Sequence, residues 1–363
     1  MKILHIINSL ETGGAEKLVV ETLPLYSEQG FTVDLLLLNG TNHPFLKELA
    51  EKKCCEIFTL GNSSVYHPKY IIKIIPFLKK YDIVHVHLFP AQYYVAIAKI
   101  FCSAKAKLIF TEHSTSNRRM VSPYFAGLDR LFYLSYNKII AISEGVRLAL
   151  EKHLKDGNKI EVIENGVNIS KVSEASLDKK INELFPAENT KLLLQVAGFR
   201  VEKDQETTIH SLIHLPSNFH LLLVGDGERK KDLFNLVKQL NLESRVHFLG
   251  RRMNVFSILK NVDFVIVSSH WEGFGLVAVE GMAANKPVVA SNVPGLSEIV
   301  KGAGILFPHG DEKKLAKEIL KLANDKEYYD QIALQCLNRA KAFHIGKMVE
   351  EHIILYRKLC LEK

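Results

Sequence analysis

The chain has 363 residues, of which 47% are hydrophobic and 24% are charged, and its formal net charge is +7. This length favours two domains of a soluble globular protein, and no apolar run approaches the ~20 residues that span a bilayer, which excludes an integral membrane protein. The modest basic bias lacks aromatic interleaving or a DNA-binding motif, which argues against nucleic acid as a partner. Five scattered cysteines without a CxxC pair predict reduced thiols in the cytoplasm.

The first predicted strand covers residues 2–7 and is followed by a turn that contains Gly13 and Gly14. A helix then runs to about Gln29, with Gly30 as its expected C-terminal stop. A strand, a glycine turn and a helix N-terminus form a loop that attracts anions. The turn matches neither GxGxxG nor a P-loop, so a plain tight turn is the alternative.

Strands then recur between helical patterns, which predicts a mostly parallel, doubly wound sheet with ligands at the carboxyl ends of its strands. The predicted strands are residues 33–38, 55–59, 83–86, 107–110, 139–142 and 161–163.

Polar residues at the ends of three of these strands are candidates to line a cleft. They are His85 with His87, the run Thr111–His113, and Ser143 with Glu144. His85 and His87 point the same way if the pleat stays regular. No third ligand is in view in the sequence, so a metal site is not expected. By spacing alone His113 could also be a hydrogen-bonded structural histidine.

Residues 68–80 combine isoleucines with Lys69, Lys73, Lys79 and Lys80, and further cations follow later in the first half of the chain. These further cations are Arg118, Arg119, Arg130 and Lys138. One interpretation is amphipathic helices that pack on the sheet and extend their charges into water. Another is a basic, partly apolar face for a membrane surface or a lipid-linked acceptor. Pro76 is expected to interrupt the helix.

The predicted domain boundary follows Asn168, since the next twenty residues lack strand character. We expect an N-terminal domain of residues 1–170, a linker of residues 171–190, and a C-terminal domain of residues 191–345. A last helix, residues 346–363, is expected to cross back onto the first domain.

The second domain opens with a strand at residues 192–196, followed by Gly198, Arg200 and Lys203. Two cations beside a glycine turn suit a diphosphate, whose charge they neutralise. The alternative is a surface loop in which the cations pair with Glu202 and Asp204. Strands at residues 220–224 and 246–249 end in further glycine turns, at Gly225 and Gly250.

A buried strand at residues 264–267 leads into the turn Glu272–Gly275 and then a short helix over residues 276–284. Glu272 and Glu280 have seven residues between them, which places them ~10–13 Å apart and suits gripping two ends of one long ligand. Glu280 is the only charge in this apolar helix. Glutamate is rarely buried without a partner, and the alternative is an exposed surface glutamate.

This stretch, HWEGFGLVAVEGMAANKPVVASNVPG, resembles the signature of retaining glycosyltransferases of family 4. The resemblance implies an α/β protein of the GT-B architecture, with two Rossmann-like doubly wound parallel-sheet domains facing across a cleft. It also implies transfer of a hexose-type sugar from a nucleoside diphosphate sugar, UDP favoured over GDP. The acceptor would be a glycan or a lipid-linked acceptor in surface polysaccharide synthesis, such as capsule or lipopolysaccharide.

In this resemblance Glu272 holds sugar hydroxyls, Glu280 holds the ribose, and the turn amides hold the diphosphate. The residues expected to act in catalysis are His113, Glu272, Lys203 and Arg200. Those expected to bind the donor are Gly13, Gly14, Gly198, Arg200, Lys203, Gly225, Gly250, Glu272, Gly273, Phe274, Gly275, Leu276 and Glu280.

The implied chemistry is a front-face attack in which the leaving phosphate takes the acceptor's proton. Domain closure would assemble the site and exclude water. The sequence contains no DxD motif, which agrees with chemistry that needs no metal or other cofactor. Two positions depart from the family pattern, because Gly198 stands where an arginine is common and Asn168 stands where an aspartate often is.

Three alternatives stay open at this point. They are a GT-B nucleotide-sugar epimerase, a dinucleotide-dependent oxidoreductase, and a non-catalytic protein that binds sugar nucleotides or a lipid surface. The oxidoreductase lacks GxGxxG with an acidic residue ~20 positions on. We expect a cytoplasmic protein, with the inner face of the membrane as a possible place of contact.

Overall fold

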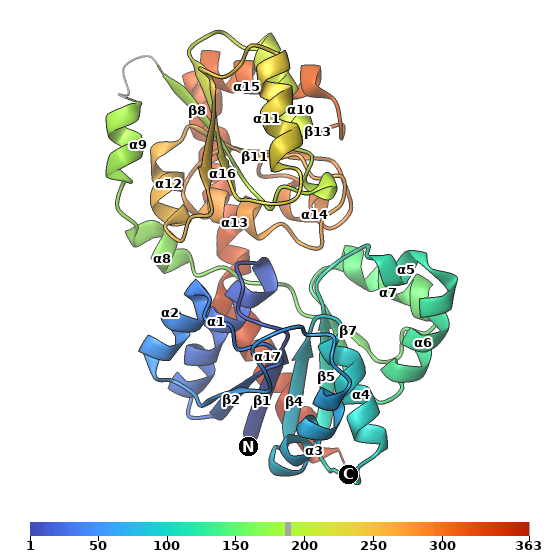
Figure 1. The fold of residues 1–363 in the computed structure, drawn as a ribbon. Coiled ribbons are helices and arrows are strands. Elements are labelled where there is room, and N and C mark those ends of the chain that lie inside the picture. The colour runs from blue at the N-terminus through green and yellow to red at the C-terminus, as the bar shows by residue number, and fades with distance from the viewer. Residues whose placement is uncertain (186–189, 363) are drawn as a thin grey trace. The chain divides into compact units, whose positions relative to one another are not determined.

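The computed structural model describes residues 1–185 and 190–362, which divide into two compact units. The first unit contains residues 1–166 and the C-terminal helix α17 (Ile345–Leu361). The second unit contains the described residues between 167 and 344. Each unit is a parallel sheet covered by helices, so the expected pair of Rossmann-like domains is confirmed (Figure 1).

The sheet of the first unit has seven strands in the order β3-β2-β1-β4-β5-β6-β7, and all its pairs are parallel. The central strands are runs of buried apolar residues, as expected for parallel strands that are covered on both faces. The strands are β1 (Lys2–Ile7), β2 (Thr32–Leu37), β3 (Ile57–Thr59), β4 (Ile83–His87), β5 (Lys107–Glu112), β6 (Lys138–Ala141) and β7 (Ile160–Val162).

Helices connect these strands, and α17 returns from the far end of the sequence to pack against α1. Figure 1 shows α17 in red beside the blue ribbons of α1 and β1. The other helices of this unit are α1 (Gly14–Glu28), α2 (Pro44–Lys52), α3 (Lys69–Lys80), α4 (Ala91–Ile100), α5 (Arg118–Val121), α6 (Pro123–Tyr133) and α7 (Glu144–Leu154).

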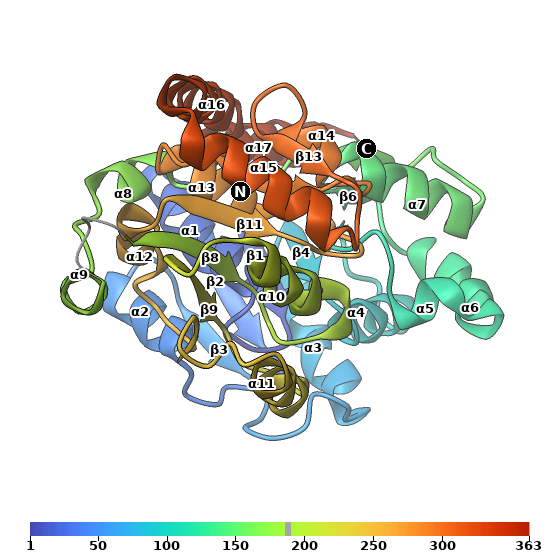
Figure 2. The ribbon, with the colours of Figure 1, turned by 90° about the horizontal axis from the view of Figure 1, so that it is seen from above.

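The sheet of the second unit has the strand order β10-β9-β8-β11-β12-β13, also with all pairs parallel. Its strands are β8 (Lys191–Val196), β9 (Phe219–Val224), β10 (Val246–Gly250), β11 (Phe264–Val267), β12 (Val288–Ser291) and β13 (Ile305–Phe307). Within this unit α15 (Glu312–Asn324) and α16 (Lys326–Ala340) lie side by side, as Figure 2 shows.

The remaining α-helices of the second unit are short. They are α8 (Ile169–Glu174), α9 (Lys179–Leu184), α10 (Gln205–Ser211), α11 (Lys230–Gln239), α12 (Val255–Asn261), α13 (Leu276–Ala283) and α14 (Ser297–Val300). Single 3₁₀ turns lie at Val201–Lys203, Leu212–His214 and Lys341–Phe343. Among the described residues, no helix combines the length and the apolar character needed to cross a membrane.

Two expectations differ from the structure. Pro76 does not interrupt α3, because the buried face of Tyr70, Ile74 and Leu78 holds the helix together although the proline lacks one backbone donor. The stretch 171–190 was expected to be a linker with one short helix, but its described part contains the end of α8 and all of α9, and it belongs to the second unit. Residues 186–189 lie outside the described residues.

Asn168 and Asp178 explain the two short helices. Each side chain accepts hydrogen bonds from backbone N–H groups in the first turn of the helix that follows it. Val172 and Ile181 then anchor these helices, because both side chains are buried.

Candidate functional site

The strand order of the second sheet has a topological switch between its two central strands, β8 and β11. The chain leaves β8 toward β9 on one side and leaves β11 toward β12 on the other. In open parallel sheets, ligands bind at the carboxyl ends of the strands at such a switch. The two loops that meet there are residues 197–204, after β8, and residues 268–275, after β11.

Polar side chains at the base of these loops join them to each other. Gln195 Nε2 donates to the Lys203 carbonyl at 2.8 Å and to Ser268 Oγ at 2.9 Å. Ser268 Oγ donates in turn to the Asp204 carbonyl at 2.6 Å, and the His270 amide donates to the Glu202 carbonyl at 2.9 Å. The two loops are therefore held in a fixed relation at the end of the sheet.

Lys203, which the sequence predicts to bind a diphosphate, forms an ion pair with Glu272, which the family resemblance implies for the sugar. The distance from Lys203 Nζ to Glu272 Oε2 is 2.6 Å, and Ser269 Oγ donates to the same oxygen at 3.0 Å. Their side chains are 27% and 17% exposed. Lys203 therefore faces the second loop. The surface-loop alternative would instead pair it with Glu202 or Asp204.

Arg200 is 67% exposed at its side chain, and its guanidinium lies 3.9 Å from Glu202. This long ion pair with Glu202 agrees with the surface-loop alternative for Arg200, and the cation stays largely in solvent beside the turn at Gly198. Strand β8 is thus followed by two cations, the exposed Arg200 and the half-buried Lys203.

The N-terminus of α13 begins at Gly275, which has a φ of +92°. A Cβ at this position would lie 2.6 Å from Leu296 Cδ1, so both the backbone angle and the space favour glycine. The helix begins at Leu276 directly after it, and Gly273 precedes it in the turn. Phe274 is buried and packs edge-on against Phe343, so its contact with a ligand is limited to its backbone.

Gly225 and Gly250 belong to the adjacent strand ends, and the Gly225 amide donates to the Gly250 carbonyl at 2.9 Å. Gly225 has a φ of +146°, and a Cβ there would lie 1.9 Å from the Ala197 carbonyl oxygen. A side chain at this position would push the loop after β9 away from the loop after β8.

Glu280 is 3% exposed within α13, which excludes the alternative of a surface glutamate. The helix around it is buried as well, at Ala278, Val279, Gly281 and Met282. The spacing of Glu280 from Glu272, and its contact with a ribose, stay predictions.

The first unit has its own switch between β1 and β4, and histidines gather there. His5 of β1 pairs in register with His85 of β4, and the rings of His85 and His87 lie 4.4 Å apart between centres. The prediction that His85 and His87 point the same way is thus confirmed. Gly13 caps α1 and Gly14 opens it, in the loop that follows β1.

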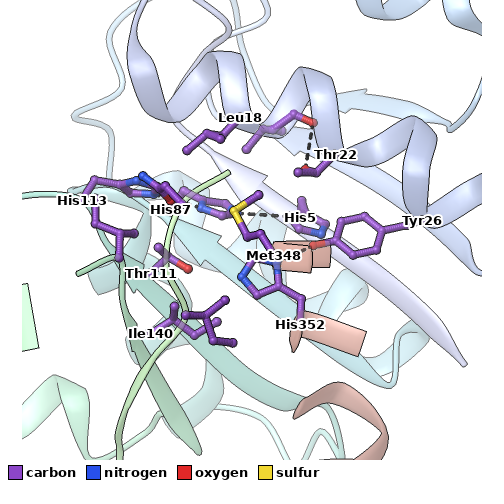
Figure 3. Close-up of a pocket in the computed structure, with 14 residues that line it drawn as sticks. His5, Leu18, Thr22, Tyr26, His87, Thr111, His113, Ile140, Met348 and His352 are labelled. Carbon is purple, nitrogen blue, oxygen red and sulfur yellow. Dashed lines mark hydrogen bonds between the residues drawn. The ribbon is translucent and has the colours of Figure 1, made fainter. Parts of the chain in front are cut away.

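His5, His87 and His113 line a cavity of about 20 Å³ together with Tyr26, Thr111, Asn165, Met348 and His352 (Figure 3). That volume is about enough for one water molecule. His113, at the end of β5, approaches His87 with 3.3 Å between Nε2 and Nδ1. The cavity lies wholly within the first unit.

Hydroxyl groups bond the histidines that lie deeper. His85 Nδ1 lies 2.5 Å from the Tyr356 hydroxyl and its Nε2 lies 2.6 Å from Thr111 Oγ1. The Tyr26 hydroxyl lies 2.6 Å from His352 Nδ1. Tyr356 and His352 both come from α17, so the C-terminal helix completes this cluster.

Burial lowers the pKa of all these rings because it disfavours the charged imidazolium. The pKa falls to about 3 for His5 and His352 and to about 4 for His113. For His85 and His87 it lies well below the usual value of 6.5, and neighbouring histidines add to the effect of burial. The cluster is therefore neutral at pH 7.

The expectation that no third ligand accompanies His85 and His87 was wrong. His5 adds one from β1, and one ring nitrogen from each of the three lies within 4.8 Å of the other two. A β-strand pairing across about eighty residues of sequence brings it there. Both nitrogens of His85 are nevertheless bonded to hydroxyl groups, so the cluster is held by hydrogen bonds in this structure.

Arg119 was grouped with a basic surface, but it is buried. Its guanidinium lies 3.1 Å from Glu112 and 2.8 Å from Asp129, and His153 Nε2 lies 2.8 Å from the other Asp129 oxygen. Burial raises the pKa of Glu112, and the nearby Arg119 opposes that rise. Arg119 therefore compensates buried carboxylates and contributes nothing to a surface.

Ser143 and Glu144 also have local roles. Ser143 Oγ accepts from the Val146 amide at 3.2 Å and caps α7, while Glu144 pairs with Arg147 on the surface of the same helix. Of the polar candidates at the three predicted strand ends, those of β4 and β5 therefore supply residues to the cavity, and those after β6 supply a helix cap and a surface ion pair.

Sequence reasoning missed His5, Tyr26, His352 and Tyr356. Two signals pointed to three of them, and none pointed to Tyr26. One is a lone histidine within the apolar strand KILHII, and the other is the spacing of His352 and Tyr356, which places both on one face of a helix.

Comparisons with known proteins agree with this architecture. The family described as Glycosyltransferase Family 4 matches residues 12–171, and Glycosyl transferases group 1 matches residues 176–338. The Bacillus anthracis N-acetyl-alpha-D-glucosaminyl L-malate synthase is 26% identical over 282 residues, which cover 76% of this chain and 74% of that protein.

An Escherichia coli protein, UDP-Gal:alpha-D-GlcNAc-diphosphoundecaprenol alpha-1,3-galactosyltransferase, is 24% identical over 100% of this chain and 98% of its own length. Among solved structures, Anabaena Alr3699/HepE in complex with UDP-glucose superimposes with a TM-score of 0.87 at 24% identity. The match covers 99% of this chain and 100% of that one, and it shows a shared GT-B fold.

Proposed function

Because the chain belongs to glycosyltransferase family 4, we propose that it transfers a hexose-type sugar from a UDP-sugar to a glycan or lipid-linked acceptor in surface polysaccharide synthesis. The observation that carries this proposal is the pairing of Lys203 with Glu272 at the switch of the second sheet. A cation for the diphosphate and a carboxylate for sugar hydroxyls lie side by side beside the N-terminus of α13.

Each group has a role that fits its environment. Lys203 and the exposed Arg200 neutralise the charge that develops on the leaving diphosphate, and the amides at Gly275 and Leu276 donate to it. When the donor binds, the Glu272 carboxylate gives up part of its ion pair with Lys203 and accepts hydrogen bonds from the sugar hydroxyls. The Glu280 carboxylate accepts hydrogen bonds from the ribose hydroxyls. His113 contacts the donor sugar, as the family resemblance implies.

We further propose that the reaction retains the anomeric configuration by front-face attack and requires no metal. The support is the resemblance of the Glu272 to Glu280 motif to the retaining family. Retention of configuration and independence from metal can each be measured directly. The anomeric coupling constant of the product, read early in the reaction by NMR, should match that of the donor, and activity should survive EDTA.

The acceptor class is the least constrained part, because the relatives differ. The E. coli relative is named for a diphosphoundecaprenol-linked sugar and the B. anthracis relative for L-malate. We propose the lipid-linked class, supported by the match along the whole length of the E. coli protein.

The test offers UDP-glucose, UDP-galactose and UDP-N-acetylglucosamine in turn to the wild-type protein, with a polyprenyl-diphosphate-linked sugar, with L-malate, or with no acceptor. Transfer to the lipid-linked sugar is expected. Conversion of the donor to another sugar without any acceptor would establish the epimerase instead, and transfer to malate alone would overturn the acceptor class.

A cytoplasmic location, with peripheral contact at the inner face of the membrane, is part of the proposal. The support is α3, where Ile72 is 73% exposed and Lys69, Lys79 and Lys80 are exposed as well. Such a helix suits an anionic lipid surface. Cosedimentation with phosphatidylglycerol vesicles, lost in Lys79→Glu/Lys80→Glu and in high salt, would support it, and equal binding to neutral vesicles would contradict it.

A further inference from the structure

Three histidines of the first unit form a continuous hydrogen-bonded row, which Figure 3 shows from His113 through His87 to His5. His113 Nε2 lies 3.3 Å from His87 Nδ1, and His87 Nε2 lies 3.1 Å from His5 Nδ1. His87 is thus bonded through both of its nitrogens to another imidazole.

The geometry of the row is that of hydrogen bonds and not of ligands around a metal. The planes of His5 and His87 are 9° apart and their centres 5.4 Å apart, which is the nitrogen–nitrogen distance plus the two ring radii. The two nitrogens therefore face each other in line. The centres of His87 and His113 are 5.5 Å apart, which fits the same arrangement.

A neutral imidazole carries one N–H, so the row has only two self-consistent states. In the first, His113 donates from Nε2 to His87, His87 donates to His5, and His5 is left with an N–H at its own Nε2. In the second, every bond is reversed. His5 donates from Nδ1, His87 donates from Nδ1, and His113 accepts at Nε2 and carries its proton at Nδ1.

The far nitrogen of His5 decides between these states. His5 Nε2 has almost no surface open to the cavity, so a water there does not reach it, and it has no hydrogen-bond partner among the described residues. An orphaned buried N–H is rarer in proteins than an orphaned acceptor. The favoured state is therefore the second one, in which His5 Nε2 is a bare nitrogen.

We propose that His87 is a positioning residue that holds His113 in its Nδ1–H tautomer, so that His113 presents a hydrogen-bond donor and not an acceptor to the sugar substrate. The part that concerns substrate rests on the proposed function of His113 beside the donor sugar. The tautomer itself belongs to the protein without ligand.

The tautomer can be read directly from ¹⁵N spectra of the full chain labelled at histidine, because bare and protonated ring nitrogens resonate far apart. His113→Ala identifies the signals of His113. In the wild type at pH 7.5 we expect a bare Nε2 and a protonated Nδ1. A protonated Nε2 in the wild type would overturn the proposal without recourse to any variant.

His87→Phe removes the partner of His113 Nε2 and should release His113 to a mixture of tautomers. His352→Phe is the matched control, because His352 lines the same cavity but bonds Tyr26 and stands outside the row. It should leave the tautomer of His113 unchanged. An unchanged tautomer in folded His87→Phe would contradict the proposal.

Kinetics then show whether the tautomer matters. If only the Nδ1–H form is competent, His87→Phe should lower kcat/KM for the donor by the fraction of His113 that keeps this form, about five- to tenfold for a fraction of about 10–20%. In a His113→Ala background, adding His87→Phe should lower the activity no further. Full activity of His113→Ala alone would refute the assigned role of His113, and the tautomer measurement would stand apart from that failure.

Discussion

At the scale of a single residue, the ion pair of Lys203 would prepare the proposed donor site for a ligand. Its ammonium is held against Glu272 at 2.6 Å, and both side chains remain partly exposed. Pairs of this kind contribute about 0–1 kcal/mol to stability. The pairing therefore orients two groups at little energetic gain, and a ligand with phosphate and hydroxyl groups can replace it.

Substitution of this lysine should affect activity far more than stability. For Lys203→Ala we expect kcat/KM for the UDP-sugar to fall by about 10²- to 10³-fold, the usual loss when one charge-stabilising donor is removed. Steady-state kinetics measure it. Lys313→Ala, an exposed lysine of α15, is the control and should behave as wild type. Wild-type kcat/KM in Lys203→Ala would refute the role of Lys203.

Glu280 should contribute to nucleotide binding through its charge. Glu280→Gln keeps the shape of a side chain that is 3% exposed but weakens its bonds to ribose hydroxyls. We expect about tenfold weaker UDP binding by calorimetry, which is about 1.4 kcal/mol. Glu327→Gln, at an exposed position in α16, should bind UDP normally. Equal UDP affinity of the two variants would show that Glu280 does not contribute to nucleotide binding.

At the scale of elements, the site depends on where α13 begins. Gly275 has a φ of +92° and contacts Leu296, whereas Gly302 has a φ of +79° with no atom within 4 Å of a Cβ built there. Both positions penalise a side chain through the backbone, by about 1–2 kcal/mol. Of the two, only Gly275 adds a steric clash, at the N-terminus of α13.

The two glycines therefore form a matched pair. Gly302→Ala should destabilise the second unit modestly and leave UDP affinity unchanged. Gly275→Ala should destabilise it more and also weaken UDP binding, because the first amides of α13 shift. Urea unfolding followed through Trp271, with UDP titrations, compares them. Equal UDP affinity in the two variants would mean that the N-terminus of α13 does not contact the nucleotide.

The elements also show what the sequence could supply. The succession of strands and helices along the chain, the turn before α13, and Gly30 as the stop of α1, with a φ of +82°, follow from local patterns, since each depends on neighbouring residues. The continuity of helix α3 did not follow from a local pattern. The burial of Tyr70, Ile74 and Leu78 stabilises the helix by more than Pro76 destabilises it. The burial of Arg119 was also missed, because its partner Asp129 belongs to a different helix.

At the scale of the whole molecule, the first unit depends on contacts between distant parts of the chain. His5 meets His87 across 82 positions of sequence, and His85 meets Tyr356 across 271. No local pattern reports such pairings. The sequence could therefore predict His113 and His87 as strand-end candidates but not the row of imidazoles that joins them to His5.

The histidine cluster should make the first unit sensitive to acid. Its pKa values are lowered in the folded state, to about 3 for His5 and His352, so below pH 6.5 the unfolded state binds more protons. The free energy of unfolding should then fall by about 1.4 kcal/mol per pH unit for each such histidine, and should level off above pH 7.

Hydrogen exchange read by mass spectrometry can locate this effect. Peptides from β1 and β4 should lose protection between pH 6.5 and 4.5, after correction for the intrinsic rate, before peptides from β8 and β11 do. In His352→Phe the slope should be smaller. Loss of protection in both units at the same pH would show that the cluster does not govern acid unfolding.

Thermal unfolding with UDP, GDP, ADP and NAD is the most direct test of the claim that this chain is a UDP-sugar-dependent glycosyltransferase. A ligand at ~100 times its dissociation constant adds about 2.7 kcal/mol to the folded state. For a unit of this size that is a shift of roughly 5–10 °C. We expect this shift with UDP in the wild type and its loss in Lys203→Ala. A response to NAD with none to UDP would contradict it.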